Sequence, residues 1–600
     1  MIKISVFDRN YERVTYETIL EKNVCPPLSD NPFKHKLFNN DTFTYDTVSK
    51  KVSIVHSPIR SQKDIPSVLI LEGNKTYGKK KDKLLYRCIP NDTTIPSFLV
   101  PYDIKSLPFS KVMFNAYVTI SFVSWTEKEK HPFGVLSQFI GSVFNRENFY
   151  EYQLYCRGLN DTLQKTIKDT SKSLEKNADM LDMKEIINKY PQIEKRIDMN
   201  EWFVFTIDPY GSTDLDDAYS IKTINKDKEQ YMISIYIPNV PLYIDILNLW
   251  ESLSERVSTI YLPNKKRPML PPILSDSIIS LIENSKPKCA FTMDIYITNT
   301  EVVDIQFKTT LVKISKNYAY EEKDLLNNKH YQLLFDITTS LFKSNKDKYK
   351  YIEDIKDSHD LVAYLMIFMN YKCGVRLKEG RGGIFRTMVK RDYTTNDKNK
   401  SSEVIVNDTI LLSNLDKDVS NFLKIWNSSS GGVYLLYSDI KSDDELYHNI
   451  LNLEAYIHIT SPIRRLVDIL NMTQFIKIYD MLDLSESAYD FYTSKCEEIN
   501  DINNKMKQIR KIQTECELLN MLNTNIDLLT KQYKGYNFAK KPSLKSVGFF
   551  EYSVYLPELK IVTKVICESV MEDYDMNMYS LYLFEDENRF NKKIRVSLCK

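Results

Sequence analysis

The stretch from Thr206 to Ile221 constrains this chain more than any other, because it holds four aspartates within ten residues: Asp208, Asp214, Asp216 and Asp217. The apolar run Trp202–Phe205 precedes the cluster and a Tyr-Ser-Ile step follows it, so both flanks have the composition of buried strands. Carboxylates held together at the edge of a core repel one another, and desolvation increases that cost. Divalent cations would offset the repulsion, and Mg²⁺ suits oxygen ligands while leaving positions for water and phosphate.

Three kinds of site have to be weighed for such a cluster. A calcium loop of the helix–loop–helix kind needs a glycine at its sixth position and a glutamate at its twelfth. Counted from Asp214, these positions hold Tyr219 and Asn225, which excludes a calcium loop of this kind. A solvated acidic loop and a two-metal site for phosphoryl transfer remain open on spacing alone.

Three motifs stand in order along the chain. The first is the string Asp208-Pro-x-x-x-x-Asp214-Leu-Asp216-Asp217-Ala. The second is Tyr261-Leu-Pro with Pro268-Met-Leu-Pro271, and the third is Thr460-Ser-Pro-Ile-Arg464-Arg465 with Asp468. Together they resemble the motifs of the ribonuclease II (RNB) family of 3′→5′ exoribonucleases, including its spacing of four aspartates. Three ordered matches are far more specific than any one of them.

The resemblance implies an enzyme that hydrolyses single-stranded RNA from its 3′ end and releases nucleoside 5′-monophosphates. In such an enzyme the four aspartates hold two Mg²⁺ ions, or Mn²⁺, directly or through water, and two metals of this kind assist an in-line displacement. Asp216 matches the aspartate on which turnover depends most. Arg464 is expected at the scissile phosphate, because Ser461 and Pro462 predict a helix N-terminus there and a guanidinium binds phosphate with paired donors.

Three more residues are RNA-binding candidates by the same resemblance. Tyr261 and Tyr320 match aromatic positions near the RNA 3′ end, where stacking clamps the last bases. Arg465 is expected to contact phosphate or to support the fold, and Asp468 to orient Arg464. Without the family match, a lone tyrosine is more often part of a core and a helical arginine more often lies on a surface.

Several positions depart from the family pattern. Tyr236 and Asn239 stand where the family has a histidine and an aspartate, and Met388 stands where it has another histidine. A downstream helical glutamate has no secure counterpart, because the segment Lys505–Glu517 aligns in more than one way. These departures favour an alternative, an RNA-binding or adaptor protein of RNB fold without turnover. A nuclease that also acts on DNA is a second alternative, since contacts to the 2′-hydroxyl cannot be derived from the sequence.

The expected fold class is a multidomain α/β (α+β) protein, in which an RNB catalytic domain is flanked by all-β OB-fold barrels. Short strands separated by turns predict small barrels near the N-terminus, and the chain returns to strands near its end. The expected divisions are 1–40 as an extension, 41–95 and 96–158 as cold-shock-like barrels, 159–534 as the catalytic domain with its core at 196–480, and 535–600 as an S1-like barrel. Trp125, in the second barrel, is either a stacking platform for bases or a core residue.

Local patterns predict individual elements inside the catalytic domain. Helices are expected over 159–195, with a cap at Asn160-Asp161, over 247–253, and over 357–378 with a stop at Gly380. Strands over 291–297 and 302–308 are expected to form a hairpin.

Composition sets broad limits. The formal net charge is only +1, so total charge does not indicate a nucleic-acid binder, and the Lys79–Lys83 run is typical of a solvated turn. Nine cysteines without a CxxC pair favour reduced thiols inside a cell. The charged start lacks the apolar core of a signal peptide, and no apolar run reaches the ~20 residues of a membrane span. We therefore expect a soluble, cytoplasmic monomer that binds single-stranded RNA and no membrane.

Overall fold

A computed structural model of the chain describes residues 1–19, 31–46, 48–103, 113–177, 181–284, 286–344, 354–388, 415–416, 418–420, 422–423, 432–448, 450–543 and 548–599. The chain divides into two compact units. The barrel unit comprises residues 1–160, 262–264 and 510–600, and the sheet unit comprises residues 161–261 and 265–509. Each unit is described by itself.

The barrel unit begins with a four-stranded antiparallel sheet. Its strands are β1 (Ile2–Val6), β2 (Val14–Thr18), β3 (Thr42–Asp46) and β4 (Lys51–His56), in the order β2-β1-β3-β4. Ile4, Val6 and Phe43 of these strands are buried in one apolar cluster with Tyr11 and Leu37. The expected N-terminal extension therefore contributes two strands to a sheet with its own apolar core.

The next strands close into a barrel. They are β5 (Ile65–Leu69), β7 (Lys83–Pro90), β8 (Phe98–Tyr102), β9 (Ala116–Ser124) and β10 (Phe133–Ser142), with the short β6 (Lys79–Lys80) paired to β7. Strand β5 pairs with both β9 and β7, which closes the ring β5-β7-β8-β10-β9. Taken as five consecutive strands, this is the order 1-2-3-5-4, with strands 3 and 5 parallel, of a five-stranded OB-type barrel.

This pairing crosses the expected boundary at residue 95. Strands on both sides of that residue share one barrel, so the division between the two N-terminal β structures falls between β4 and β5. Alternating patterns locate strands but do not specify their partners, which is why the sequence does not place this boundary. Trp125 is 6% exposed and its ring lies against Phe33 and Phe38, so it is a core residue and not a stacking platform.

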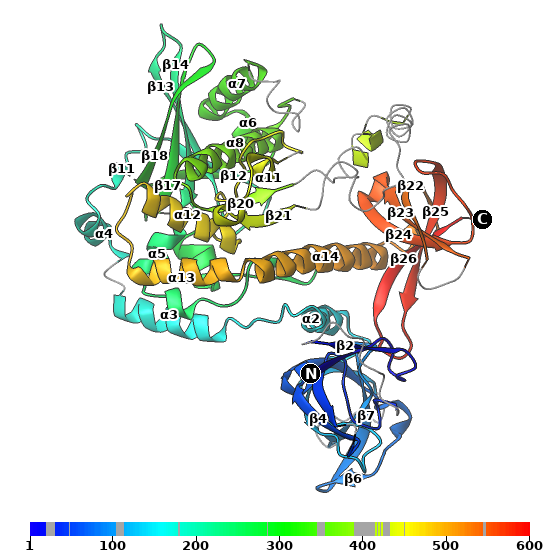
Figure 1. Ribbon diagram of the computed structural model, residues 1–600. Coiled ribbons are helices and arrows are strands. Elements are labelled where there is room, and N and C mark those ends of the chain that lie inside the picture. The colour runs from blue at the N-terminus through cyan, green and yellow to red at the C-terminus, as the bar shows by residue number, and fades with distance from the viewer. Residues whose placement is uncertain are drawn as a thin grey trace. The chain divides into compact units, whose positions relative to one another are not determined.

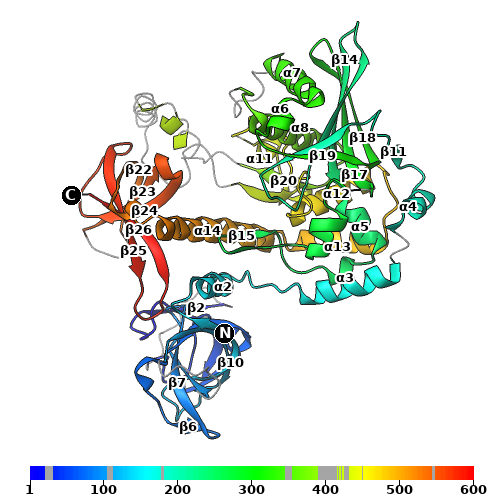
Figure 2. The same cartoon turned by 180° about the vertical axis from the view of Figure 1, so that it is seen from behind.

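The chain ends in a second barrel of the same strand order. Its strands are β22 (Gln532–Pro542), β23 (Phe550–Leu556), β24 (Ile561–Cys567), β25 (Met576–Glu585) and β26 (Lys592–Leu598). The sheet order is β24-β23-β22-β25-β26, and the edge strands β24 and β26 contact each other. Figures 1 and 2 show these strands in orange and red from opposite sides.

A seven-stranded mixed sheet forms the centre of the sheet unit, in the order β11-β18-β17-β14-β13-β12-β19 (Figure 1). The strands are β11 (Glu194–Arg196), β12 (Val204–Asp208), β13 (Ala218–Asn225), β14 (Gln230–Pro238), β17 (Lys288–Thr298), β18 (Glu301–Val312) and β19 (Ile314–Ala319). The predicted hairpin is β17–β18. Asn299 and Thr300 in its turn both have positive φ, as a two-residue type I′ turn requires.

The sheet unit also contains several longer helices. They are α3 (Gln164–Asn177), α4 (Met183–Lys189), α5 (Val240–Ile246), α7 (Lys329–Ser344), α8 (Ser358–Glu379), α12 (Leu466–Ile478), α13 (Glu486–Glu497) and α14 (Ile499–Thr524), which continues into the barrel unit. Helix α12 packs on the sheet through Phe475, whose ring lies 5.1 Å from that of Phe291 and 4.9 Å from that of Phe307. Within the described residues, no helix is long and apolar enough to span a bilayer.

The predicted helices differ from the observed ones in their bounds. The helix expected over 159–195 is observed as α3 and α4, and its last two positions belong to strand β11. Helix α8 stops at Gly380 as expected. Helix α3 begins at Gln164, because the carboxylate of Asp161 accepts a bond from Lys505 instead of capping a helix. The helix expected over 247–253 instead spans Val240–Ile246, since Asn239 caps it by accepting from the amide of Leu242 at 3.2 Å.

Candidate active site

The aspartate cluster lies where two central strands end and begin. Strand β12 ends at Asp208, and β13, its antiparallel neighbour, begins at Ala218, so the loop between them carries the other three aspartates at one edge of the sheet. The neighbouring strand β19 ends at the same edge. There the amide of Tyr320 donates to the carbonyl of Asp208 at 3.1 Å. The fold therefore brings Tyr320 to the cluster.

Asp208 and Asp217 carry the strongest mutual repulsion of the cluster. The Oδ2 atom of Asp208 is buried and has no hydrogen-bond partner among the described residues. Burial, followed by the nearby charge of Asp217, raises the pKa of Asp208 to about 8. Burial also raises the pKa of Asp217, although the hydroxyl of Tyr219 donates to its Oδ2 at 2.5 Å and opposes that change. The charge of Arg464 also opposes the increase at Asp217, but neither carboxylate forms a salt bridge with a described residue.

Asp216 and Arg464 form the direct link between two distant motifs. Asp216 is 3% exposed, and its Oδ2 accepts from Nε of Arg464 at 2.9 Å while its Oδ1 accepts from the amide of Ile463 at 3.1 Å. Burial raises the pKa of Asp216 to about 7, and the charge of Arg464 opposes the increase. The structure thus brings Asp216 into contact with Arg464, which is 248 residues away in the sequence.

The segment around Arg464 differs from the expected helix start. Residues 461–465 form a turn, in which the carbonyl of Ser461 accepts from the amides of Arg464 and Arg465, and α12 begins only at Leu466. The amide of Ser461 donates to Asp468, which also accepts from Nη2 of Arg465 at 2.9 Å. Asp468 therefore orients Arg465 and the turn, and not Arg464 as expected.

Asp214 is engaged by two side chains from one nearby hairpin. That hairpin is formed by β15 (Ile260–Leu262) and β16 (Lys265–Arg267). The hydroxyl of Tyr261 donates to Oδ2 of Asp214 at 3.0 Å, and Nζ of Lys266 donates to its Oδ1 at 3.0 Å. The sequence identified Tyr261 but missed Lys266. The basic run beside the Tyr261 motif was its only sequence signal.

Tyr320 does not stand alone. Its ring is stacked on that of His359 with centroids 3.7 Å apart and planes inclined by 11°. His359 lies in the first turn of α8 and was not identified from the sequence. The stacked pair lies beside Asp208, whose carbonyl accepts from the amide of Tyr320.

The departures from the family pattern have structural roles here. The hydroxyl of Tyr236 accepts from Nη1 of Arg196 at 3.2 Å. The same nitrogen donates to the buried carboxylate of Asp294. Asn239 is the cap of α5. Met388 forms an isolated bridge with His448. None of the three replaces one of the clustered aspartates.

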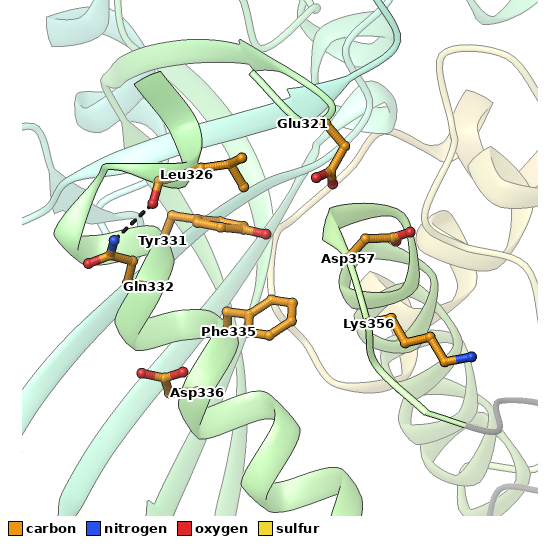
Figure 3. A pocket seen from close by; sticks show the side chains of 8 residues that line it. All are labelled: Glu321, Leu326, Tyr331, Gln332, Phe335, Asp336, Lys356 and Asp357. Atoms are coloured by element: carbon orange, nitrogen blue, oxygen red, sulfur yellow. Dashed lines mark hydrogen bonds between the residues drawn. The ribbon is translucent and has the colours of Figure 1, made fainter. Parts of the chain in front are cut away.

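A separate cavity of about 410 Å³ lies between the N-terminal part of α7 and the start of α8. In Figure 3 the rings of Tyr331 and Phe335 face it, with the carboxylate of Glu321 above and that of Asp357 on the opposite side. Its lining does not include Arg464 or any of the four clustered aspartates. The cavity is therefore distinct from the aspartate site.

The residues present fit a divalent cation at one part of the cluster. Within the described chain, no three acidic, histidine or cysteine side chains are already arranged as a cation cage. The buried Oδ2 of Asp208 nevertheless has no hydrogen-bond partner among the described residues, and Asp208 and Asp217 repel each other. A cation bound between these two carboxylates would stabilise their ionised forms. Asp214 and Asp216, in contrast, already face Lys266 and Arg464.

The profile of the RNB domain matches residues 196–333 and 326–480. This range holds the whole central sheet except two residues of β11, together with the aspartates, Tyr261, Tyr320 and Arg464. The chain carries an RNB domain. The match confirms the RNB domain that the three motifs indicate.

Similar proteins extend the comparison beyond the RNB domain. The chain is 25% identical to DIS3-like exonuclease 2 of Schizosaccharomyces pombe over 285 residues, 46% of this chain and 28% of the relative. It is 21% identical to ribonuclease R of Buchnera aphidicola over 514 residues, 74% of this chain and 67% of the relative. The chain thus spans between about a quarter and two thirds of the length of these relatives.

Solved structures agree in fold. Ribonuclease R of Mycoplasma genitalium, in complex with ribose-methylated single-stranded RNA, has a TM-score of 0.67 at 13% identity, with all of both chains covered. Yeast Ssd1, described as a pseudonuclease, has a TM-score of 0.57 at 15% identity over 86% of this chain and 66% of Ssd1. These matches confirm the predicted fold class, an RNB domain flanked by OB-type barrels.

Proposed function

We propose that the protein is a metal-dependent 3′→5′ exoribonuclease that hydrolyses single-stranded RNA to nucleoside 5′-monophosphates. The observation that carries this proposal is the contact between Arg464 and Asp216 at 2.9 Å, beside the buried Asp208 and Asp217. The contact holds a phosphate-binding group next to the two carboxylates that would bind a cation, which is the combination that phosphodiester hydrolysis needs. The relatives named as ribonucleases and exonucleases support the same reaction.

Arg464 would bind the scissile phosphate. Its Nε is held by Asp216 and its Nη2 by Ser461 Oγ at 3.0 Å. Among the described residues Nη1 makes no hydrogen bond, and 43% of the side chain is exposed. The guanidinium is therefore fixed on one side and open on the other, as a preorganised donor for developing negative charge has to be.

Asp208 and Asp217 would hold the divalent cation, Mg²⁺ or Mn²⁺. When bound, such a cation supplies Lewis-acid stabilisation of phosphate oxygens and favours the ionised form of a bound water. The mechanism expected from the sequence uses two cations. Whether a second cation binds depends on whether Asp214 is free to act as a ligand.

Tyr261 and Tyr320 are proposed to stack on the bases at the RNA 3′ end. Tyr261 is 43% exposed, and its hydroxyl is anchored on Asp214. Tyr320 is backed by His359. Both rings thus have a partner beside the carboxylates, where stacking on a base would contribute ~1–3 kcal/mol.

A labelled oligonucleotide tests the proposal. Purified protein, a 5′-labelled oligoribonucleotide and Mg²⁺ should yield a ladder of shortened RNA and mononucleotides, and EDTA should stop the reaction. Asp216→Asn should abolish turnover while RNA binding persists, whereas the exposed Asp227→Asn should behave like wild type. A circular RNA of the same sequence should resist, since it has no 3′ end. Intact linear RNA after incubation with wild type over a range of divalent metals would refute the proposal.

A second candidate is an RNA-binding protein of RNB fold that does not cleave. The similarity to Ssd1, a pseudonuclease, and the changes at Tyr236, Asn239 and Met388 favour it. The four aspartates and the placement of Arg464 argue against it. Binding of the same oligonucleotide without any shortening would select this candidate. Side-by-side ribo- and deoxyribo-oligonucleotides would show whether DNA is also a substrate.

A further inference from the structure

Lys266 sits inside a small cage of oxygens next to the aspartate cluster. Its Nζ lies 2.7 Å from Oγ1 of Thr213, 3.0 Å from Oδ1 of Asp214 and 3.1 Å from Oδ1 of Asp276. An ammonium group has three protons, so these three acceptors use all of them. The amine therefore makes the contacts of a fixed cation, not those of a solvated surface lysine.

The cage is built by three parts of the sheet unit. Thr213 and Asp214 come from the aspartate loop, Lys266 from β16, and Asp276 from the single π-helical turn at Leu274–Ile278. The side chains of Lys266, Asp214 and Asp276 are 26%, 12% and 28% exposed, so the pairs are partly shielded from water. Ser275 Oγ donates to the same Oδ1 of Asp276 at 2.7 Å and fixes that carboxylate.

Both oxygens of Asp214 are thereby engaged by this chain's own donors, Oδ1 by Lys266 and Oδ2 by the hydroxyl of Tyr261. A divalent cation bound to Asp214 would have to lie within a few ångströms of the ammonium, and the two positive charges would repel. Asp208 and Asp217 form no salt bridge with any described residue, so the need for a cation is concentrated on them.

We propose that the ammonium of Lys266 occupies the position at Asp214 that a second divalent cation would need, so that the aspartate cluster takes a single divalent cation, at Asp208 and Asp217. Asp214 is then a positioning residue that holds Lys266 and Tyr261 at the edge of the site. This inference rests on the proposed metal-dependent function and specifies how many cations that function uses.

Counting bound Mn²⁺ tests the inference without any nuclease assay. Metal-free full-length protein is titrated with Mn²⁺, and free ion is measured by electron paramagnetic resonance. Wild type should bind one ion per chain at the cluster. Lys266→Met removes the charge and leaves the oxygens of Thr213, Asp214 and Asp276 around an empty position, so it should bind two. Lys266→Arg keeps a positive charge and should bind one.

Lys265→Met is the matched control, because Lys265 is the exposed neighbour on the same strand and should leave the count at one. Lys266→Gln gives a second neutral variant if Lys266→Met does not fold. Two ions bound to wild type, or one ion bound to both Lys266→Met and Lys266→Gln, would overturn the inference about Lys266 and leave the proposed function standing. No Mn²⁺ on wild type, with RNA left uncleaved, would overturn the proposed function as well. A lysine with a merely structural role would change stability but not the number of ions.

Discussion

At the scale of single residues, the site depends on which charge faces which carboxylate. Asp216 faces Arg464, Asp214 faces Lys266, and Asp208 with Asp217 face each other. The spacing of the aspartates predicted their convergence, because ten residues of one loop cannot separate far. It could not predict their partners, because Lys266 and Arg464 reach the loop only through the fold.

The open edge of the Arg464 guanidinium leads to a test by substitution. Arg464→Lys keeps the charge but loses the paired donors, so turnover should fall on the order of 10²–10³-fold while RNA affinity changes little. Single-turnover cleavage and fluorescence anisotropy measure the two effects. Arg376→Met, which removes an exposed arginine on α8, should leave both unchanged. Equal losses in Arg464→Lys and Arg376→Met would contradict the role proposed for Arg464.

Tyr261 should act on RNA affinity more than on the chemical step. Tyr261→Ala removes a stacking ring worth ~1–3 kcal/mol, which corresponds to an increase in KM of roughly 5- to 150-fold. Tyr261→Phe keeps the ring and loses only the hydrogen bond to Asp214, so its KM should stay near that of wild type. Steady-state kinetics on a short oligoribonucleotide measure both variants. A KM for Tyr261→Phe as high as that for Tyr261→Ala would show that the hydroxyl, not stacking, matters.

At the scale of secondary structure, strands and turns were easier to predict than helix starts. The hairpin of β17 and β18 follows from alternation and from a turn that accepts positive φ. The start of α12 moved from Pro462 to Leu466 because the buried Asp468 binds the amide of Ser461, a contact seven residues away. Short-range preferences were overridden there by a buried charge that needed partners.

Strand β17 carries a buried lysine that gives a pH test. Nζ of Lys288 donates to the carbonyls of Ser277 and Ile278, and burial, together with the charge of Lys286, lowers its pKa to about 8. Between pH 8 and ~10.5 the amine is protonated in the unfolded chain but neutral in the folded one. The free energy of unfolding should therefore rise with pH over this range, by up to about 3 kcal/mol. Urea unfolding at several pH values should show this rise.

Two variants isolate that contribution. Lys288→Met should flatten the rise between pH 8 and 10.5, because no buried amine is left to lose a proton. The exposed Lys286→Met should retain most of it. An identical pH dependence in wild type and Lys288→Met would mean that Lys288 is not the group responsible.

At the scale of the whole molecule, repulsion within the aspartate cluster is a cost that cation binding would offset. The buried oxygen of Asp208 has no partner among the described residues, and nearby Asp217 is buried too. Such a site weakens the metal-free fold and strengthens the metal-bound one. The charges that would bind the cation for function therefore also make the stability of the fold depend on that cation.

Thermal unfolding should therefore respond to Mg²⁺. Saturating the site at 100 times Kd should stabilise the native state by about 2.7 kcal/mol and raise Tm by a few degrees. Asp208→Asn should raise the Tm of metal-free protein and remove most of the Mg²⁺ response, because it removes one of the repelling charges. Asp336→Asn, an exposed acid beside the separate cavity, serves as control. A full Mg²⁺ response in Asp208→Asn would place the cation elsewhere.

The sequence by itself determined the family, the order of its motifs, and the loop that carries the four aspartates, because residue types and short spacings are properties of the covalent chain. Only the tertiary structure decided that Asp216 meets an arginine 248 residues away, that Lys266 binds Asp214, and that strands on both sides of residue 95 share one barrel. Such pairings follow from which surfaces pack together. Many pairings satisfy the same alternating pattern, and packing in three dimensions selects among them.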